Sequence, residues 1–405
     1  MRRIVLLDSN WAGHHPTYFK AFAAALLELG YDVHAICPEP EEFRKAMGGE
    51  TVSASRLSVY RWNPPRVRVW PRRFAEAVHL FYVNRWMVRE LTRIERGAGQ
   101  RFDLVFFACL YDGYLRHFPL RFPWPWAGLY LQVRAFRMPG QPLPYTNFVP
   151  DPRRLFRSPR LCGLGVLDEG ALGYLREVTR CPNVEAFPDL TDESPPKCEG
   201  VAAALKEFAA GRAIVGVAGF LQPTKGIVTL ARVAERMREA DVVFAFVGEM
   251  LQGVYSAEEE VLLARVFALP NVFVSFVRVP DGPLFNGVLD QFAVIFAAYE
   301  NFPHSSNILT KAAFLEKPVV ASDGYLMAER VREYGLGAVV PEADVDALVV
   351  ALHQLLGDGW GSQDHSQMKQ YLRNHSYECL RASIGRLIRN ACEMRESNAQ
   401  NGGLQ

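Results

Sequence analysis

Residues 213–249 of the chain, AIVGVAGFLQPTKGIVTLARVAERMREADVVFAFVGE, contain two apolar runs separated by an amphipathic segment. The runs Ala213–Ala218 and Asp241–Val247 have the length and the apolar content of buried β-strands. Between them, Ile227–Arg238 carries its apolar residues at helical spacing. A strand, a helix and a second strand in this order form a right-handed unit with parallel strands. The stretch therefore predicts an α/β fold with a parallel sheet.

The same alternation of short apolar runs and longer amphipathic segments extends over most of the chain. In the first half, strands are predicted at Ile4–Leu7, Asp32–Cys37, Leu104–Ala108, Ala127–Val133 and Leu161–Leu167. In the second half, further strands are predicted at Val272–Phe276, Ala293–Ala297 and Pro318–Ala321. Two doubly wound, Rossmann-like domains explain this pattern, and the carboxyl ends of their strands are expected to meet at a common cleft.

A segment rich in proline and acidic residues divides the chain. Phe187–Pro196, FPDLTDESPP, predicts a linker. We therefore expect an N-terminal Rossmann-like domain over residues 1–190 and a C-terminal one over residues 191–375. In residues 376–405, a helix from Ser376 to Met394 is expected to return to the first domain, and the polar tail that follows it is expected to fray.

The composition is that of an ordinary globular protein. Of the 405 residues, 49% are hydrophobic and 22% are charged, which excludes a wholly disordered or collagen-like chain. The 45 basic and 44 acidic residues nearly cancel, and without a recognisable binding motif no nucleic-acid partner is expected. The 7 cysteines form no CxxC pair, which indicates reduced thiols rather than a disulfide framework or a zinc site. Because no apolar run has the length of a signal peptide or a membrane span, we expect a cytoplasmic protein.

The basic residues concentrate between Arg56 and Arg96, a stretch that also holds several tryptophan, phenylalanine and tyrosine residues. A basic and aromatic stretch can lie on an anionic membrane surface, which would make the protein peripheral at the inner face of the membrane, or it can recruit an anionic substrate. The alternative is an arginine-rich helix whose aromatic side chains lie in the core.

Ligands of open α/β sheets bind at the carboxyl ends of the strands, so the loops there are the candidate sites. The loop Asp8–His15 enters a helix, with Gly13 allowing a close backbone approach and His14 or His15 available for phosphate binding or proton transfer. The loop Gly219–Gly226 combines glycines with Thr224 and Lys225 before a helix, which suits a diphosphate. It lacks the spacing of a P-loop.

Two further loops carry polar residues at the start of a helix. Tyr299–Asn307 holds Glu300 and His304, and its residues Ser305, Ser306 and Asn307 can bind phosphate oxygens or merely cap the helix. In Ser322–Glu329, Glu329 can accept hydrogen bonds from hydroxyl groups of a ribose or sugar, or its charge can stabilise the helix dipole.

Other acidic residues are given less weight. Asp344 and Asp346 have the spacing of a metal-binding pair, but Asp344 is predicted to cap the helix Val345–Leu356. Asp189 and Asp192 fall in the predicted linker, where acidic residues are common. No cluster of histidine and cysteine has metal-ligand spacing, and no GxSxG or GxGxxG is present.

The motifs of the second half together resemble the nucleotide-sugar domain of the retaining family 4 glycosyltransferases, which have the GT-B fold. These motifs are Gly219…Lys225-Gly226, Phe246-Val247-Gly248, Glu300, Lys317-Pro-Val-Val-Ala-Ser-Asp323 with Glu329, and Gly337-Ala-Val-Val-Pro341. The first half resembles the family through Gly13-His14 before a helix and Gly30-Tyr-Asp-Val33 after it. Where the family often has an arginine five residues before the lysine, this chain has Phe220, and where it has a second glutamate this chain has Lys311.

The resemblance implies a role for each matching residue. Lys225 would hold the leaving diphosphate, Glu300 would lie near the sugar hydroxyls, and His14 would contact the acceptor or the phosphates; these three are the implied catalytic residues. The implied nucleotide-sugar site comprises Gly13, Gly219, Thr224, Lys225, Phe276, Val277, Arg278, Ser305, Ser306, Asn307 and Glu329, with the base held by backbone groups of Phe276–Arg278.

The implied function is transfer of a sugar from a UDP- or GDP-sugar to a glycan or lipid-linked acceptor, with retention of configuration. The resemblance implies no cofactor and no metal, since helix dipoles and a lysine can stabilise the departing diphosphate. Because Phe220 and Lys311 depart from the family, the alternative is a catalytically impaired protein that binds a nucleotide sugar or a glycan. An epimerase or a phosphorylase of the same fold is a further alternative. The set of acids and histidines of an epimerase is not recognised in this chain, and a phosphorylase normally carries a cofactor lysine and a longer chain.

Overall fold

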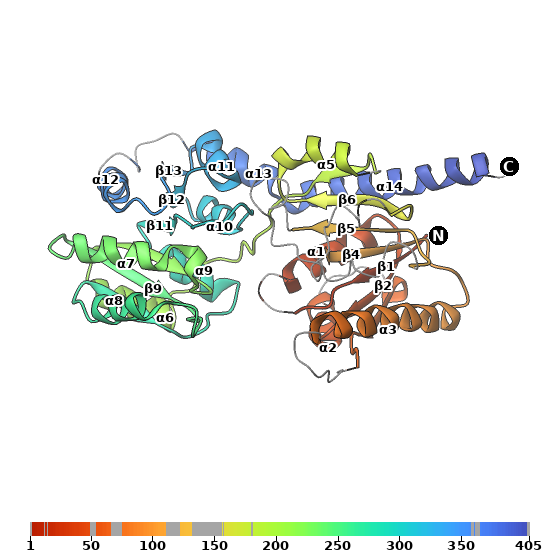
Figure 1. Ribbon diagram of the computed structural model, residues 1–405, viewed down its shortest axis with the longest axis horizontal. Coiled ribbons are helices and arrows are strands. Elements are labelled where there is room, and N and C mark those ends of the chain that lie inside the picture. The colour runs from red at the N-terminus through yellow and green to blue at the C-terminus, as the bar shows by residue number, and fades with distance from the viewer. Residues whose placement is uncertain are drawn as a thin grey trace. The chain divides into compact units, whose positions relative to one another are not determined.

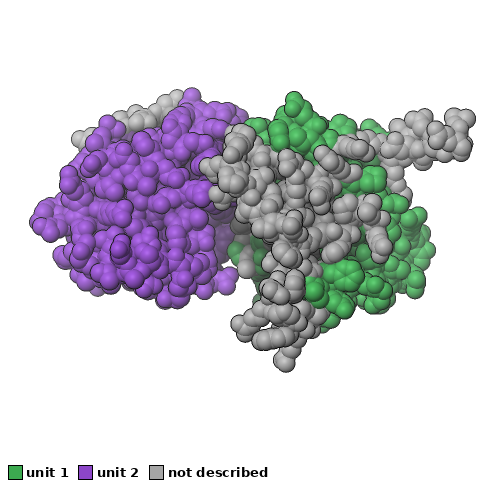
Figure 2. All heavy atoms as spheres, in the orientation of Figure 1, with its two compact units in different colours: residues 1–188, 376–405 green, residues 189–375 purple. Residues whose placement is uncertain are grey.

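The computed structural model describes residues 2–11, 13, 15–48, 54–65, 75–110, 122–131, 156, 158–179, 181–357, 360 and 365–402. Its chain forms two compact units, coloured separately in Figure 2. Unit 1 comprises residues 1–188 together with 376–405, and unit 2 comprises residues 189–375. The chain therefore leaves unit 1 once, completes unit 2 and returns.

Unit 1 is built on a seven-stranded parallel sheet in the order β3-β2-β1-β4-β5-β6-β7. Its strands are β1 (Arg3–Leu7), β2 (Asp32–Cys37), β3 (Leu57–Arg61), β4 (Leu104–Leu110), β5 (Trp126–Tyr130), β6 (Leu161–Val166) and β7 (Val184–Ala186). Its helices are α1 (His15–Glu28), α2 (Pro40–Met47), η1 (Ala54–Arg56), α3 (Ala75–Gly97), η5 (Glu169–Ala171), α5 (Leu172–Val178) and α14 (Tyr377–Gly402). The strand order reverses between β1 and β4, which is where a doubly wound sheet binds its ligands.

Unit 2 repeats this plan with a six-stranded parallel sheet in the order β10-β9-β8-β11-β12-β13. Its strands are β8 (Ala213–Ala218), β9 (Val242–Val247), β10 (Val272–Ser275), β11 (Val294–Ala297), β12 (Val319–Ser322) and β13 (Gly337–Val340). Its helices are α6 (Val201–Ala209), η6 (Pro223–Lys225), α7 (Ile227–Arg236), α8 (Ala257–Phe267), α9 (Pro283–Asp290), α10 (Ile308–Phe314), α11 (Leu326–Tyr334), α12 (Val345–Leu356) and α13 (Ser366–Asn374) (Figure 1). Here the order reverses between β8 and β11.

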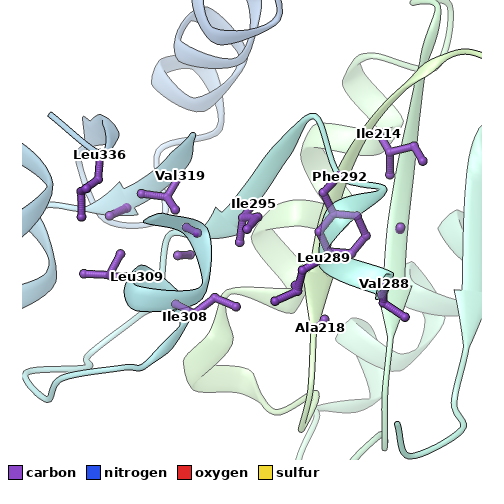
Figure 3. Packing of buried hydrophobic residues seen from close by; sticks show 14 of the residues in the cluster. Ile214, Ala218, Val288, Leu289, Phe292, Ile295, Ile308, Leu309, Val319 and Leu336 are labelled. Carbon is purple, nitrogen blue, oxygen red and sulfur yellow. The ribbon is translucent and has the colours of Figure 1, made fainter. Parts of the chain in front are cut away.

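The sheet of unit 2 has an apolar cluster of buried side chains on each face. Figure 3 shows part of one cluster, in which Ile295 and Val319 of the sheet face Leu309 of α10. Phe292 packs against the sheet over Gly216, where a Cβ atom would overlap its ring. Burial on both faces is the reason why the strands are continuous apolar runs rather than alternating ones.

The structure corrects one local expectation, the linker, and adds the extent of the C-terminal helix. The predicted linker begins with buried residues, since Phe187 is 1%, Asp189 2% and Leu190 7% exposed, and only the later part is solvent-exposed. The predicted fraying tail is helical as far as Gly402 in α14. This helix contacts α1 and β6 of unit 1 (Figure 1). Asn183 donates a hydrogen bond from Nδ2 to the Leu387 carbonyl oxygen of this helix at 2.7 Å.

In the basic and aromatic stretch, Trp62 is buried in the core of unit 1 and Trp86 packs, partly buried, against that core. Helix α3 buries Val83, Met87, Leu91 and Ile94, while Phe81 and Tyr82 are exposed. Among the described residues, no helix has the length and apolarity of a membrane span.

Candidate active site

In unit 2, Lys225 lies at the carboxyl end of β8. The chain turns after this strand through Gly219, with φ of 101°, and enters α7 through Gly226, with φ of 66°. The Lys225 Nζ donates a hydrogen bond to the Ala218 carbonyl oxygen at 3.0 Å and lies 5.6 Å from the centre of the Tyr299 ring. Gly248 follows β9 and packs so closely that a Cβ atom there would overlap the Gly219 carbonyl oxygen. The glycines therefore hold the lysine loop against the neighbouring strand end.

Glu300 belongs to the loop after β11 and is tied to this lysine loop. Its backbone N–H donates to the Thr224 carbonyl oxygen at 2.9 Å, and its Oε1 accepts a hydrogen bond from Thr229 Oγ1 at 2.5 Å. Since β8 and β11 flank the point where the strand order reverses, the structure brings Thr224, Lys225 and Glu300 together at the place where this fold binds ligands. Thr229, on α7, is a partner of Glu300 that sequence reasoning missed.

Ser305, Ser306 and Asn307 precede α10, as the sequence predicts, but their hydrogen bonds were not foreseen. The Ser305 hydroxyl donates a short hydrogen bond to Asp189 Oδ2 and accepts one from Arg330 Nη1 at 2.6 Å. Asn307 is the N-cap residue and makes no side-chain capping hydrogen bond. Ser305 is thus held by two charged residues that sequence reasoning did not connect to it.

Asp189 and Arg330 form a buried ion pair. Arg330 Nη1 lies 3.5 Å from Asp189 Oδ2, and each side chain is 3% exposed. The Thr310 hydroxyl donates to the Asp189 carbonyl oxygen at 2.8 Å, and the Asp189 N–H donates to His375 Nδ1 at 2.8 Å. Asp189 and His375, the first and last residues of unit 2, are therefore hydrogen-bonded to each other. The sequence offered no signal for Asp189 beyond its place in the linker.

Burial, and secondarily the charge of Arg330, lower the pKa of His375 from 6.5 to about 2. Below pH 6.5 the unfolded chain binds a proton at this histidine and the folded protein does not. The free energy of unfolding is therefore expected to fall as the pH falls from 6.5 toward 2, by up to about 1.4 kcal/mol per pH unit. His375→Asn, which keeps an acceptor for the Asp189 N–H, is expected to flatten this slope in urea unfolding measured at several pH values.

His353 is exposed on α12 and provides the matched control. His353→Asn is expected to leave the slope of the wild-type protein unchanged. Equal slopes for both variants would contradict the assignment to His375.

The other predicted residues of unit 2 lie at the same edge of its sheet. Phe276, Val277 and Arg278 follow the edge strand β10 and are exposed, with the Phe276 ring packed edge-on against Phe267 at 5.6 Å. Glu329 is exposed in the first turn of α11. Phe220, which stands where the related family has an arginine, is 42% exposed.

Lys311, which the sequence resemblance aligns with a second glutamate, has its charge inside unit 2. The side chain is 1% exposed, and its Nζ lies 2.8 Å from Asp281 Oδ1 and 2.9 Å from Asn286 Oδ1. Asn286 in turn donates to the carbonyl oxygens of Asp192 and Ser194. The lysine therefore stabilises the packing of α10 against α9, and its charge is balanced by Asp281.

Asp344 caps α12, as the sequence predicts: its Oδ1 accepts a hydrogen bond from the Ala347 N–H at 2.9 Å. Asp346 lies 3.9 Å from Arg236 in an exposed ion pair. Both carboxylates therefore have structural partners.

In unit 1, Asp8 and His15 form a buried pair at the carboxyl end of β1. His15 Nδ1 lies 2.9 Å from Asp8 Oδ2, and Asp8 Oδ1 accepts a hydrogen bond from the Asn10 N–H at 2.9 Å. Cys109 on β4 completes a buried group whose ligand atoms lie within 4.8 Å of one another, so these three residues could hold a metal ion. Burial, together with Asp8, raises the pKa of the Cys109 thiol well above its usual value.

The remaining predicted residues of this loop are Gly13 and His14. Gly13 is exposed, with φ of 61° and nothing within 4 Å of a Cβ atom built there. His14 lies outside the described residues.

Comparison with solved structures finds the same two-unit architecture. Sucrose-phosphate synthase from Thermosynechococcus elongatus superposes with a TM-score of 0.69 and 18% identity, covering 96% of this chain and 98% of that one. The E. coli structure described as trehalose-6-phosphate bound with UDP-2-fluoro glucose gives a TM-score of 0.68 and 12% identity, with 96% and 99% covered. HepE from Anabaena, in complex with UDP and glucose, gives 0.60 and 13%, with 99% and 100% covered. The fold is the GT-B fold of glycosyltransferases.

Residues 212–358 match the family described as Glycosyl transferases group 1. The chain thus has the GT-B fold, and most of its second unit is similar to the group 1 glycosyltransferase domain. A comparison with curated proteins found no match.

Proposed function

We propose that the protein transfers a sugar from a nucleotide-sugar donor, a UDP- or GDP-sugar, to a glycan or lipid-linked acceptor. This proposal rests on one observation: the loop of Lys225 is hydrogen-bonded to Glu300 at the point where the strand order of unit 2 reverses. The structures of HepE with UDP and glucose and of the E. coli protein with UDP-2-fluoro glucose support a UDP-sugar as donor.

The proposed reaction needs a group that stabilises the negative charge of the leaving diphosphate. Lys225 supplies a cation, and the start of α7 supplies backbone N–H groups and a partial positive charge. Glu300 accepts hydrogen bonds from hydroxyl groups of the sugar, and the hydrogen bond from the Thr229 hydroxyl fixes the position of its Oε1. Gly219, Thr224, Ser305, Ser306, Asn307 and Glu329 complete the donor site, and Phe276–Arg278 hold the base. The proposal includes no metal and no other cofactor.

Retention of configuration is part of the proposal. In this mechanism the leaving phosphate itself takes the proton of the acceptor, so that no protein nucleophile is needed. Gly13 is assigned to the nucleotide-sugar site, and His14 to contact with the acceptor or the phosphates. The charge of the Arg56–Arg96 stretch favours an anionic or lipid-linked acceptor and a cytoplasmic protein that contacts the inner face of the membrane.

A nucleotide-sugar or glycan-binding protein without transferase activity is the second candidate. Two observations favour it. Phe220 stands where the resemblance implies an arginine of the diphosphate site, and Lys311 forms an ion pair with Asp281. Binding of a nucleotide without release of the nucleotide from its sugar would support this candidate.

Thermal unfolding in the presence of UDP, GDP, ADP and their sugars tests the proposed donor site. A nucleotide at about 100 times its dissociation constant stabilises the folded protein by about 2.7 kcal/mol. We expect one base to raise the unfolding temperature and the matching sugar nucleotide to release its nucleotide when a mixed pool of acceptors is added. If no nucleotide shifted the unfolding temperature and none was released, the proposed function would be wrong.

A further inference from the structure

Unit 1 contains a pocket of about 490 Å³ that is separate from the Asp8 loop. Arg3 and Asp32 line it, and they are the first residues of β1 and β2. Because these strands are parallel, their amino ends lie at the opposite edge of the sheet from the carboxyl ends that carry Asp8 and Cys109. The pocket is therefore a different place from the proposed substrate site.

The strand residues that line the pocket share one face of the sheet. Arg3 pairs with Asp32 in the β1–β2 register and His34 pairs with Ser58 in the β2–β3 register, and side chains two positions apart on a strand point to the same side. The last turn of α3 covers this face through Arg93 and Ile94. A face of a parallel sheet covered by a helix is normally apolar, so this concentration of polar side chains is unusual.

The charge of the lining is positive. Three guanidinium groups, of Arg3, Arg56 and Arg93, line the pocket together with a single carboxylate, that of Asp32. Arg3 Nη1 donates to the Ala98 carbonyl oxygen at 3.0 Å, which offsets the negative end of α3. Arg93 is 68% exposed and donates two hydrogen bonds to the Glu90 carboxylate, at 2.5 Å and 2.9 Å, and a phosphate group at Arg93 would take the place of this carboxylate.

The pKa of His34 responds to this positive charge. It is 7% exposed, and its Nδ1 lies 3.3 Å from the Tyr60 hydroxyl. Burial lowers its pKa, the charge of Arg3 lowers it further, and Asp32 acts in the opposite direction. The arginines at positions 56 and 93 face the same pocket from η1 and α3.

We propose that this pocket binds a phosphate monoester group, as a second ligand site on unit 1. Guanidinium groups match the oxygens of a phosphate in two-pronged hydrogen bonds, and the Ser58 and Tyr60 hydroxyls are further donors at the wall. The Arg56–Arg96 stretch, whose two ends meet here through Arg56 and Arg93, is thereby assigned a defined anionic ligand instead of a diffuse surface.

Bound phosphate stabilises the protonated form of His34, so its pKa rises when the site is filled. By linkage, binding takes up protons and becomes tighter as the pH falls toward the pKa of the complex. This coupling is absent if phosphate binds only to exposed arginines elsewhere.

The test is titration calorimetry with inorganic phosphate and with glycerol 3-phosphate, together with NMR of the His34 ring assigned through His34→Asn. The double variant Arg56→Gln/Arg93→Gln is expected to weaken binding at least tenfold. The control Arg85→Gln/Arg89→Gln removes the same charge from exposed positions of α3 outside the pocket and is expected to bind like the wild-type protein. The far-ultraviolet spectrum of each variant checks its folding.

Two results would overturn the proposal. One is an absence of heat and of any His34 shift with both probes at millimolar concentration. The other is an equal loss of binding in both double variants, which would show a non-specific charge effect. Vesicles of phosphatidylcholine with phosphatidic acid distinguish the source of the phosphate. A free phosphate ester is the ligand if glycerol 3-phosphate binds and the vesicles do not, and a lipid headgroup is the ligand if the vesicles shift His34.

Discussion

Replacing Lys225 with alanine is expected to reduce the rate of sugar transfer by about 100- to 1,000-fold, because the variant loses a preorganised donor at the leaving diphosphate. The Lys225 Nζ is held at the carboxyl end of β8 by its hydrogen bond to the Ala218 carbonyl oxygen, so its position needs no rearrangement when the charge develops. The same substitution is expected to abolish the rise in unfolding temperature caused by the nucleotide. Release of the nucleotide and thermal unfolding measure the two effects.

Lys206 provides the matched control, since it is exposed in the last turn of α6 in the same unit. Lys206→Ala removes an equal charge and is expected to leave transfer and nucleotide binding unchanged. Lys225→Arg keeps the cation with a different shape and is expected to retain part of the nucleotide binding. If the Lys225→Ala protein bound the nucleotide and reacted like the wild type, the assignment of the donor site to this loop would be wrong.

Replacing Asp189 with alanine is expected to lower the free energy of unfolding of unit 2 by about 3–5 kcal/mol, because a buried ion pair that loses one partner leaves an uncompensated charge. The charge left behind is the Arg330 guanidinium, whose side chain is 3% exposed. The Ser305 hydroxyl also loses its acceptor. Urea unfolding measures the loss.

The pair Asp323 and Arg332, on the outside of the same part of unit 2, provides the comparison. Its side chains are 50% and 54% exposed and 2.7 Å apart, so Asp323→Ala is expected to cost less than about 1 kcal/mol. The double variant Asp189→Ala/Arg330→Met removes both buried charges and is expected to recover part of the stability lost in Asp189→Ala. Equal losses in Asp189→Ala and Asp323→Ala would mean that the buried pair has no special role.

Much of the architecture could be predicted from local patterns. The run Ala213–Ala218 is a strand because its apolar residues suit a surface buried on both sides, and the prediction of a GT-B α/β fold is confirmed. The loop Gly219–Gly226 was recognised because its glycines and its lysine are close in sequence. The roles assigned to Lys225, Glu300 and the other site residues stay predictions.

What the sequence by itself determined is the part that depends on neighbours along the chain: the period of the strands and helices, their order, the glycine turns and the cap of α12 by Asp344. Only the tertiary structure decided the partners of the buried charges. Local sequence places Asp189 in a linker and Lys311 at a position expected to be acidic, yet each is balanced by a residue from a distant segment. The reason is that the energy of a buried charge depends on which groups the fold brings within a few ångströms of it. The spacing of residues along the chain does not determine which groups these are.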